Sequence, residues 1–224
     1  MLITDKTLMF LGENRLNDSR DWFEEHKTEY KELVEAPLLA LAEQVCEKIE
    51  HIDPAMSLTP RKTMSRIWRD VRFSRDKTTF REEMWLVFRR GKGMEYPAFF
   101  FELSPVQWRY GVGYYSAPTK VMASIRELVL AGDRRYITAQ KALDKLNGFA
   151  IEGDTFKRPH YPQRSAAERE WLERRGFAVI RNESEPGVLF TDKLAGTLIR
   201  AFEDLAPIYS FLVDVHSEFA AEDI

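Results

Sequence analysis

Cysteine and long apolar runs are both scarce in this sequence. Cys46 is the only cysteine in 224 residues, so no disulfide can form within the chain, and we expect the reducing environment of the cytoplasm. No run of about 18 apolar residues is present, which argues against a transmembrane helix. The opening residues, MLITDKTLMF, carry neither a basic leader nor a cleavage site, which argues against a targeting signal. We therefore expect a soluble protein with no membrane partner.

An excess of basic charge is also absent. The 33 Lys and Arg residues are outnumbered by 36 Asp and Glu residues, for a formal charge of −3, so we expect no bulk nucleic-acid binding driven by net charge. A local basic patch is compatible with this balance. The four histidines show no metal-ligand spacing, and neither a phosphate-binding loop nor a dinucleotide fingerprint is found. The sequence thus identifies no enzyme signature, cofactor or metal site, and it leaves the oligomeric state open.

The sequence does contain enough apolar material for one core. Hydrophobic residues make up 44% of the chain and aromatic residues 12%, and no Pro-, Gly- or Ser-rich linker divides it. A chain of this length buries roughly 70% of the surface that its unfolded state exposes, so it needs no disulfide or metal to fold. We predict a single α+β domain over residues 1–224. Its antiparallel sheet has four to five strands, is packed on one face by helices, and is flanked by N-terminal and C-terminal helical segments.

Helical periodicity marks the segments before and after the predicted sheet. Ser19, with its neighbours Asn17 and Asp18, caps an apolar stripe that continues to Ile49. Pro37 interrupts this stretch, which is therefore one kinked helix or two helices, the second starting near Pro37. The other predicted helices are Pro118–Leu130, Asp133–Leu146, Ser165–Arg174 and Asp192–Val215, the last of them interrupted or kinked at Pro207.

A period of two, rich in aromatic and β-branched residues, marks the strands. The predicted strands are Ser65–Phe73, Met84–Arg90, Ala98–Leu103 and Gln107–Tyr115, with Phe177–Ile180 added at an edge. Alternation puts the apolar residues Met84, Leu86 and Phe88 on the core face. The opposite face then carries Trp85, Val87, Arg89, Phe100 and Glu102. Gly111 and Gly113 leave room beside this face for a ligand or for another backbone.

The segment SRIWRDVRFSRDKTTF, residues 65–80, has the densest chemistry in the chain. As a strand it places its arginines on both faces, and Arg69 falls on the core face, where its charge needs a partner. Guanidinium groups held close together repel one another, and their planar fork suits phosphate or carboxylate. The first hypothesis is a pocket for a small anionic or phosphorylated ligand. The candidate binding residues are Arg66, Trp68, Arg69, Asp70, Arg72, Lys77 and Arg89.

Other interpretations of the same residues remain open. The arginines could be neutralised within the protein by an ion-pair network of Asp70, Asp76, Glu82, Glu83 and Glu102. Alternatively, Asp70, Asp76 or Glu102 could be the general base or magnesium ligand of a hydrolase or transferase acting on a phosphorylated substrate. Trp22 and Trp85 could instead belong to a protein-interaction surface. The basic stretch KRPHYPQR, residues 157–164, is either a packed loop or a cover for the same anion site.

Three strings of residues are similar to one bacterial family. They are NDSRDWFEEHKTEYKELVEAP near the start, SRIWRDVRFSRDKTTF in the middle, and TFKRPHYP before WLERRGFAV. Over almost its whole length the chain resembles the family catalogued as domain of unknown function 2461, although Arg81 stands where the family pattern suggests a lysine. The resemblance implies a single full-length domain and no assigned catalytic role. The family's signature falls on Arg66, Arg69, Asp70, Arg72, Phe73, Ser74, Asp76 and Lys77.

Overall fold

The computed structural model describes residues 2–56, 58–72, 76–91, 93 and 95–222. Five antiparallel strands form one sheet in the order β1-β2-β3-β5-β4. The strands are β1 (Met84–Arg89), β2 (Ala98–Leu103), β3 (Trp108–Gly113), β4 (Ala150–Glu152) and β5 (Ala178–Glu183). This sheet and the helices around it confirm the predicted α+β fold with a sheet of up to five strands.

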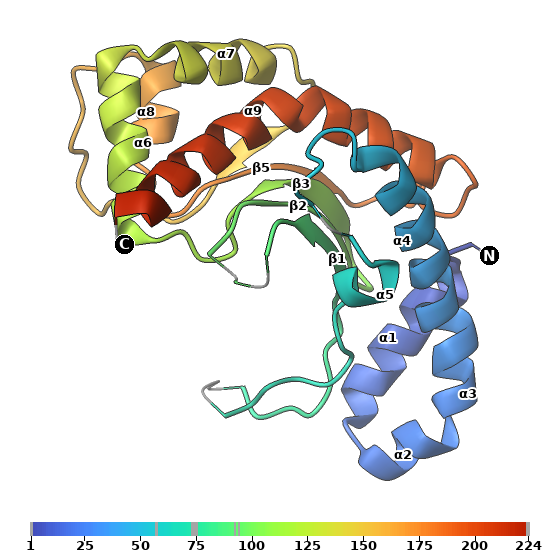
Figure 1. The fold of residues 1–224 in the computed structure, drawn as a ribbon. Helices are drawn as coiled ribbons and strands as arrows, with labels where there is room; N and C mark the ends of the chain where they lie inside the picture. Colours follow the sequence, from blue (N-terminus) through green and yellow to red (C-terminus); the bar gives the residue numbers. More distant parts are fainter. Residues whose placement is uncertain (1, 57, 73–75, 92, 94, 223–224) are drawn as a thin grey trace.

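Helices lie at both ends of the chain and between β3 and β5 (Figure 1). The N-terminal helical segment comprises α1 (Asp5–Asn17), α2 (Arg20–Glu25), α3 (Lys27–Tyr30), the π-helical turn η1 (Lys31–Glu35), α4 (Ala36–Ile49) and α5 (Pro60–Thr63). The remaining helices are α6 (Thr119–Ala131), α7 (Arg134–Leu143), α8 (Ala166–Leu172) and the long C-terminal α9 (Leu194–Glu222). Helix α9 runs across one face of the sheet, whereas the segment after α5 projects on the other side (Figure 1).

The core lies between the sheet and α9, on the face that alternation predicts. Phe88 of β1 and Phe99 of β2 are fully buried. The Phe99 ring stacks on Phe202 and Tyr209 of α9, with centroids 5.0 and 4.6 Å apart, and the Phe88 ring lies 5.8 Å from Phe202. This face therefore buries large aromatic surfaces, which dominate core energetics.

The opposite face of the sheet is only half-buried. Trp85, Val87 and Arg89 of β1 pair in register with Glu102, Phe100 and Ala98 of β2. We call this side the open face. Its mixture of aromatic, apolar and charged residues agrees with the predicted alternation.

Gly111 and Gly113 serve strand packing rather than a ligand. A Cβ atom at Gly111 would lie 2.0 Å from the carbonyl oxygen of Val179, and one at Gly113 would lie 2.4 Å from Cα of Ala178. These glycines let β3 and β5 approach closely, so of the two predicted uses of the space, the structure shows the neighbouring backbone.

Two strand predictions are wrong. The segment Ser65–Phe73 is not a strand: over its described part the chain makes isolated bridges, Met64 with Leu86 and Trp68 with Phe80, and Phe73 lies outside the described residues. The strand at 178–183 is not at an edge, because β4 pairs with its free side. Periodicity reports which side chains are buried but not which strand pairs with which, and this explains both errors.

The N-terminal helices match the second predicted alternative, a new helix near Pro37, and add one helix that was not predicted. Ser19 does cap α2, accepting a hydrogen bond from the backbone N–H of Trp22 at 3.3 Å. Pro37, which has no N–H, sits in the first turn of α4, directly after the π-helical turn η1, so the stretch is divided rather than simply kinked. Helix α1 was not predicted, because its polar composition shows little helical periodicity. Pro207 lies within a continuous α9.

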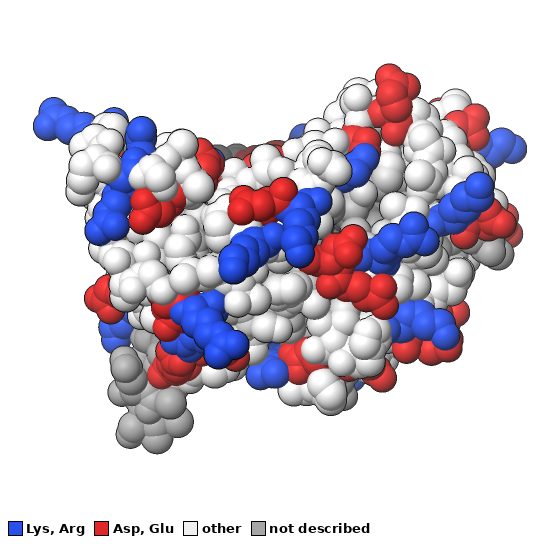
Figure 2. Space-filling model, turned by 90° about the horizontal axis from the view of Figure 1, so that it is seen from above, with Lys and Arg blue, Asp and Glu red and all other residues white. Residues whose placement is uncertain are grey.

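Charges are mixed on the helical side of the molecule. Figure 2 views it from above and shows Lys and Arg interspersed with Asp and Glu, without a patch of one sign. Across the described part of the chain, none of the helices combines the length and apolarity needed to span a bilayer.

Candidate functional site

The arginine-rich segment folds into a small lobe beside the sheet. We call residues 64–72 and 76–81 the arginine lobe. Its start bridges the edge of β1, and the lobe then doubles back: Arg69 N–H donates to the carbonyl of Thr79 at 2.9 Å, and Arg81 N–H donates to the carbonyl of Ile67 at 2.8 Å. Only this short ladder forms, so the arginines surround a hairpin-like projection instead of lining a strand of the sheet.

Aromatic packing and one carboxylate attach the lobe to the N-terminal helices. The Phe80 ring is fully buried and lies 4.9 Å from Phe23 and 4.5 Å from Trp68. One oxygen of Asp18, at the end of α1, accepts the backbone N–H groups of Thr79 and Phe80 at 2.7 and 3.1 Å. The lobe is thus held on a rigid base, which suits a binding site.

Two neighbouring hollows are lined by residues of the lobe. The first hollow, of about 600 Å³, is lined by Phe23, Lys27, Tyr30, Lys31, Glu35, Arg61, Lys62, Met64, Ser65, Arg66, Ile67 and Trp68. The second hollow, of about 520 Å³, is lined by Ser65, Arg66, Trp68, Arg69, Asp70, Val71, Arg72, Arg81 and Trp85. Ser65, Arg66 and Trp68 belong to both, so they form the ridge between them.

Some of the predicted binding arginines are neutralised by acids of the lobe. Arg72 donates from Nε and Nη2 to the two oxygens of Asp70, at 2.9 and 2.7 Å, and these hydrogen bonds lower the pKa of Asp70 to about 2. Arg69 Nη1 lies 2.9 Å from Oδ2 of Asp76, which gives Arg69 the partner that its position requires. To this extent an internal ion-pair network exists.

Two other arginines of the second hollow have no such partner. Arg66 is exposed, and Arg81 is half-buried with its guanidinium group 4.6 Å above the Trp85 ring. Within the described parts of the chain, neither side chain forms an ion pair with a carboxylate. Burial, followed by repulsion from Arg69, lowers the pKa of Arg81, yet an arginine stays protonated in proteins. A charged guanidinium group is therefore held partly out of water beside another cation.

The other two predicted cations, Lys77 and Arg89, line neither hollow. The ammonium group of Lys77 donates to the carbonyl oxygen of Val71 at 2.8 Å, so it braces the lobe. Arg89 is half-buried on the open face and lines neither hollow. Burial lowers its pKa, an effect that Glu95 partly offsets. Arg66, Trp68, Arg69, Asp70 and Arg72 are the predicted residues that the structure brings together.

The three carboxylates suggested for catalysis do not converge. Asp70 pairs with Arg72, and Asp76 accepts hydrogen bonds from Thr78 while it pairs with Arg69 and Arg15. Glu102 is held by Arg109 on the open face, with hydrogen bonds of 2.7 and 3.0 Å. Over the residues that the structure describes, no group of three or more His, Cys, Asp or Glu side chains could hold a metal ion. Each of these carboxylates therefore has basic or hydroxyl partners of its own within the chain.

Sequence reasoning missed several residues of the site. Arg81 and Trp85 form the wall of the second hollow opposite the ridge, and Lys31 and Lys62 belong to the first hollow. Glu83 is half-buried near Glu102, and burial, then Glu102, raises its pKa. A signal existed only for Arg81, the position that departs from the family pattern. Lys31 comes from a helical turn far from the lobe in sequence, whereas Lys62 comes from the short helix α5 directly before the lobe.

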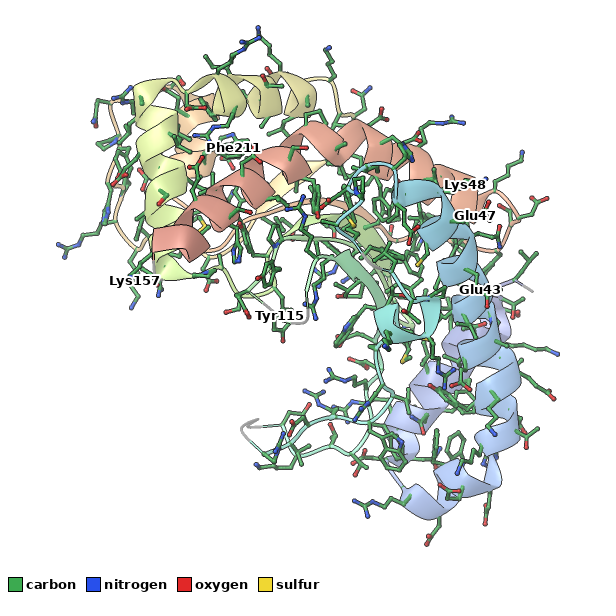
Figure 3. All side chains as sticks on the ribbon, in the orientation of Figure 1. Glu43, Glu47, Lys48, Tyr115, Lys157 and Phe211 are labelled. Carbon is green, nitrogen blue, oxygen red and sulfur yellow. The ribbon has the colours of Figure 1, made fainter. Side chains whose placement is uncertain are left out.

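The aromatic residues proposed for a partner surface are engaged within the chain. The Trp22 ring stacks on His26 with centroids 4.1 Å apart, and Trp85 lies beneath Arg81. The basic loop 157–164 packs as a loop, because the buried carboxylate of Glu173 accepts the backbone N–H groups of His160 and Tyr161. Lys157 lies by α6, away from the arginine lobe (Figure 3).

Fold and site together describe an α+β domain that carries two cationic hollows around one projecting lobe. The family of conserved hypothetical proteins called domain of unknown function 2461 matches residues 6–211. The chain belongs to this family, and the resemblance found in its sequence is confirmed. No curated protein matches the chain.

Proposed function

We propose that the second hollow binds a small anionic, phosphate-bearing ligand. The observation that carries this proposal is Arg81, which is half-buried, stacked on Trp85 and without a carboxylate partner among the described residues. A charge that is partly removed from water destabilises a protein unless an opposite charge accompanies it. A bound anion would supply that charge.

The geometry of the hollow suits phosphate. Because the Arg81 guanidinium group lies over an indole ring, its N–H groups point outward around its edge, where two of them can reach one phosphate. Arg66 offers a second fork from the ridge. The walls are Trp68, which is 37% exposed, and Trp85, so the same hollow also accepts a flat apolar group. Arg69 and Arg72, already paired with acids, shape the hollow and add to its positive potential.

Isothermal titration with pyrophosphate tests the proposal. We expect saturable binding, weakened about 10- to 100-fold by either Arg66→Gln or Arg81→Gln, because a hydrogen bond to a charged group contributes about 1.5–3 kcal/mol. Arg164→Gln is the matched control, since Arg164 pairs with Glu168 outside both hollows and should bind as the wild type does. Binding that is absent, or that survives the Arg66→Gln, Arg81→Gln double change, would refute the proposal.

We also propose that this ligand is met in the cytoplasm. The proposal is supported by Cys46, which is buried and makes no disulfide, as is usual for proteins of a reducing compartment.

A further inference from the structure

The two hollows repeat one combination of chemical groups. Each has cations around its rim and an aromatic wall, and the ridge residues Arg66 and Trp68 belong to both. A small ligand bound in the second hollow would leave the first one unused. Two adjacent hollows with the same groups fit a ligand that is built of repeating chemical units.

The first hollow is as rich in cations as the second. Of its lining, Lys31 and Lys62 are exposed and form no ion pair with any described carboxylate, and the same holds for Arg66. Lys27 pairs with Glu24 at 2.8 Å, outside the lining, and Arg61 pairs with Glu35. Among the described residues, Glu35 is the only acid that lines this hollow, against five Lys and Arg residues, so the net charge of the lining is positive.

A further aromatic side chain, that of Tyr115, lies outside the two hollows. Tyr115, which follows β3, is 78% exposed and projects on the side of the sheet from which the lobe extends (Figure 3). It is close enough to act on Arg81 electrostatically. Trp68 and Trp85 thus line the second hollow together with four arginines, and Tyr115 offers a further exposed ring near Arg81. Proteins bind single strands with alternating cations and aromatic rings, because every base has a face that can stack.

We infer that the arginine lobe binds single-stranded nucleic acid, with consecutive nucleotides in the two hollows, Trp68 stacked against a base and Arg66 on the phosphate between them. The inference rests on the proposed function, since it takes the anion of the second hollow to be one phosphate of a longer chain. Base pairs in a duplex keep their faces stacked on one another, so the aromatic walls select a single strand. The net charge of −3 means that binding depends on this local cluster and not on the protein as a whole.

Fluorescence anisotropy with labelled oligothymidylate and oligouridylate of increasing length tests the inference. We expect affinity to rise steeply from the mononucleotide until both hollows are filled, to weaken with salt, and to exceed that for a hairpin duplex. Trp68→Leu should weaken binding about 10- to 100-fold, because stacking contributes about 1–3 kcal/mol per base, and should leave the salt dependence unchanged.

A second variant avoids the packing role of Trp68. Lys31→Gln combined with Lys62→Gln changes only exposed side chains of the first hollow, and it should lower both oligonucleotide affinity and salt dependence while leaving pyrophosphate binding intact. The matched control, Lys48→Gln with Lys193→Gln, removes two exposed lysines outside both hollows and should bind normally.

The outcomes separate the two proposals. The inference is overturned, even if pyrophosphate still binds, by either of two results. One is an oligonucleotide affinity no higher than that for the mononucleotide, and the other is an affinity unchanged by the Lys31 and Lys62 substitutions. Failure of pyrophosphate to bind at all removes the proposed function as well. Tight binding to duplex that matches the single strand also overturns the inference, because it assigns the lobe to backbone charge alone.

Discussion

Arg90 and Arg81 lie at opposite ends of the β1 region and meet burial in different ways. Arg90 donates from Nε and Nη2 to Asp53, at 2.5 and 2.8 Å, and the hydroxyl of Tyr209 donates to the same carboxylate at 2.6 Å. Arg81 has an indole ring beneath it and, within the described residues, forms no ion pair with a carboxylate. Glu83 and Asp70 attract its charge, but burial and repulsion from Arg69 outweigh them and lower its pKa. The Arg90 guanidinium group is paired within the fold, whereas we propose that the charge of Arg81 is matched by an external anion.

The number of arginines in a segment therefore does not show how many of them are available to bind a ligand, because some are paired with acids of the same chain. Asp53 is 4% exposed. Its hydrogen-bond donors are Arg90, directly after β1, and Tyr209 of α9, so this network links distant parts of the chain. Burial by itself would raise the pKa of Asp53, but the hydrogen bonds from Arg90 and Tyr209 outweigh it and the pKa is lowered. Nothing comparable stabilises Arg81. Arg81, which forms no ion pair with a described carboxylate, therefore points to a ligand site, whereas Arg90 does not.

The largest expected effect comes from breaking the complete network. Asp53→Asn should lower the free energy of unfolding by about 2–4 kcal/mol, because it removes the charge partner of Arg90 and an acceptor of a buried hydroxyl. The figure lies at the low end for buried pairs because Arg90 is 37% exposed. Urea unfolding followed by circular dichroism measures it. Asp70→Asn, at the exposed Arg72 pair, is the control and should leave the midpoint unchanged.

At Arg81 we expect stability to be gained when an anion binds, whereas at Asp53 it is lost when the internal partner is removed. Pyrophosphate at 100 times its dissociation constant should stabilise the wild type by about 2.7 kcal/mol, and the Arg66→Gln, Arg81→Gln double variant should not respond. Thermal unfolding across a pyrophosphate series measures the shift. An equal shift in both proteins would mean that the anion acts elsewhere.

Arg81→Met sharpens the comparison without any ligand. The thioether chain can still cover Trp85, and no carboxylate loses its partner, so we expect unfolding free energy to change by less than about 1 kcal/mol. Arg90→Met, in contrast, leaves Asp53 buried and unpaired and should be clearly less stable. If the two variants lose stability equally, Arg81 has a structural partner after all.

A third buried basic group, His216, gives the smallest effect. Among the described residues its Nδ1 has no hydrogen-bond partner. Its ring packs against Tyr96 and Tyr114, and burial, partly offset by Glu95, lowers its pKa. Below the ordinary histidine pKa of about 6.5, the unfolded state therefore binds more protons than the folded state. Stability should be complete above that pH and decline as the pH falls beneath it. Unfolding of His216→Leu should show a flatter profile between about pH 5 and 7.

The prediction of the fold succeeded where burial alternates in a simple way. Met84, Leu86 and Phe88 are fully buried as their spacing predicts, and the residues between them lie on the open face. Helix α1 escaped prediction because its buried face includes Thr7 and Asn14, which periodicity counts as polar. For the candidate site, five of the predicted binding residues line the second hollow, but the prediction did not include Lys31 and Lys62 of the first hollow. Arg72 and Lys77 turned out to be engaged inside the lobe.

By itself the sequence determined most of the helices, the strands β1 to β3, which of their faces are apolar, and that arginines are concentrated between residues 65 and 81. These properties are local, since they follow from the spacing of residues a few positions apart. Only the tertiary structure decided which guanidinium groups meet a carboxylate and which cations share a hollow. The groups come from elements distant in sequence, as Asp53 does for Arg90 and Lys31 does for the first hollow. Charge pairing depends on distances in space, and sequence order does not encode those directly.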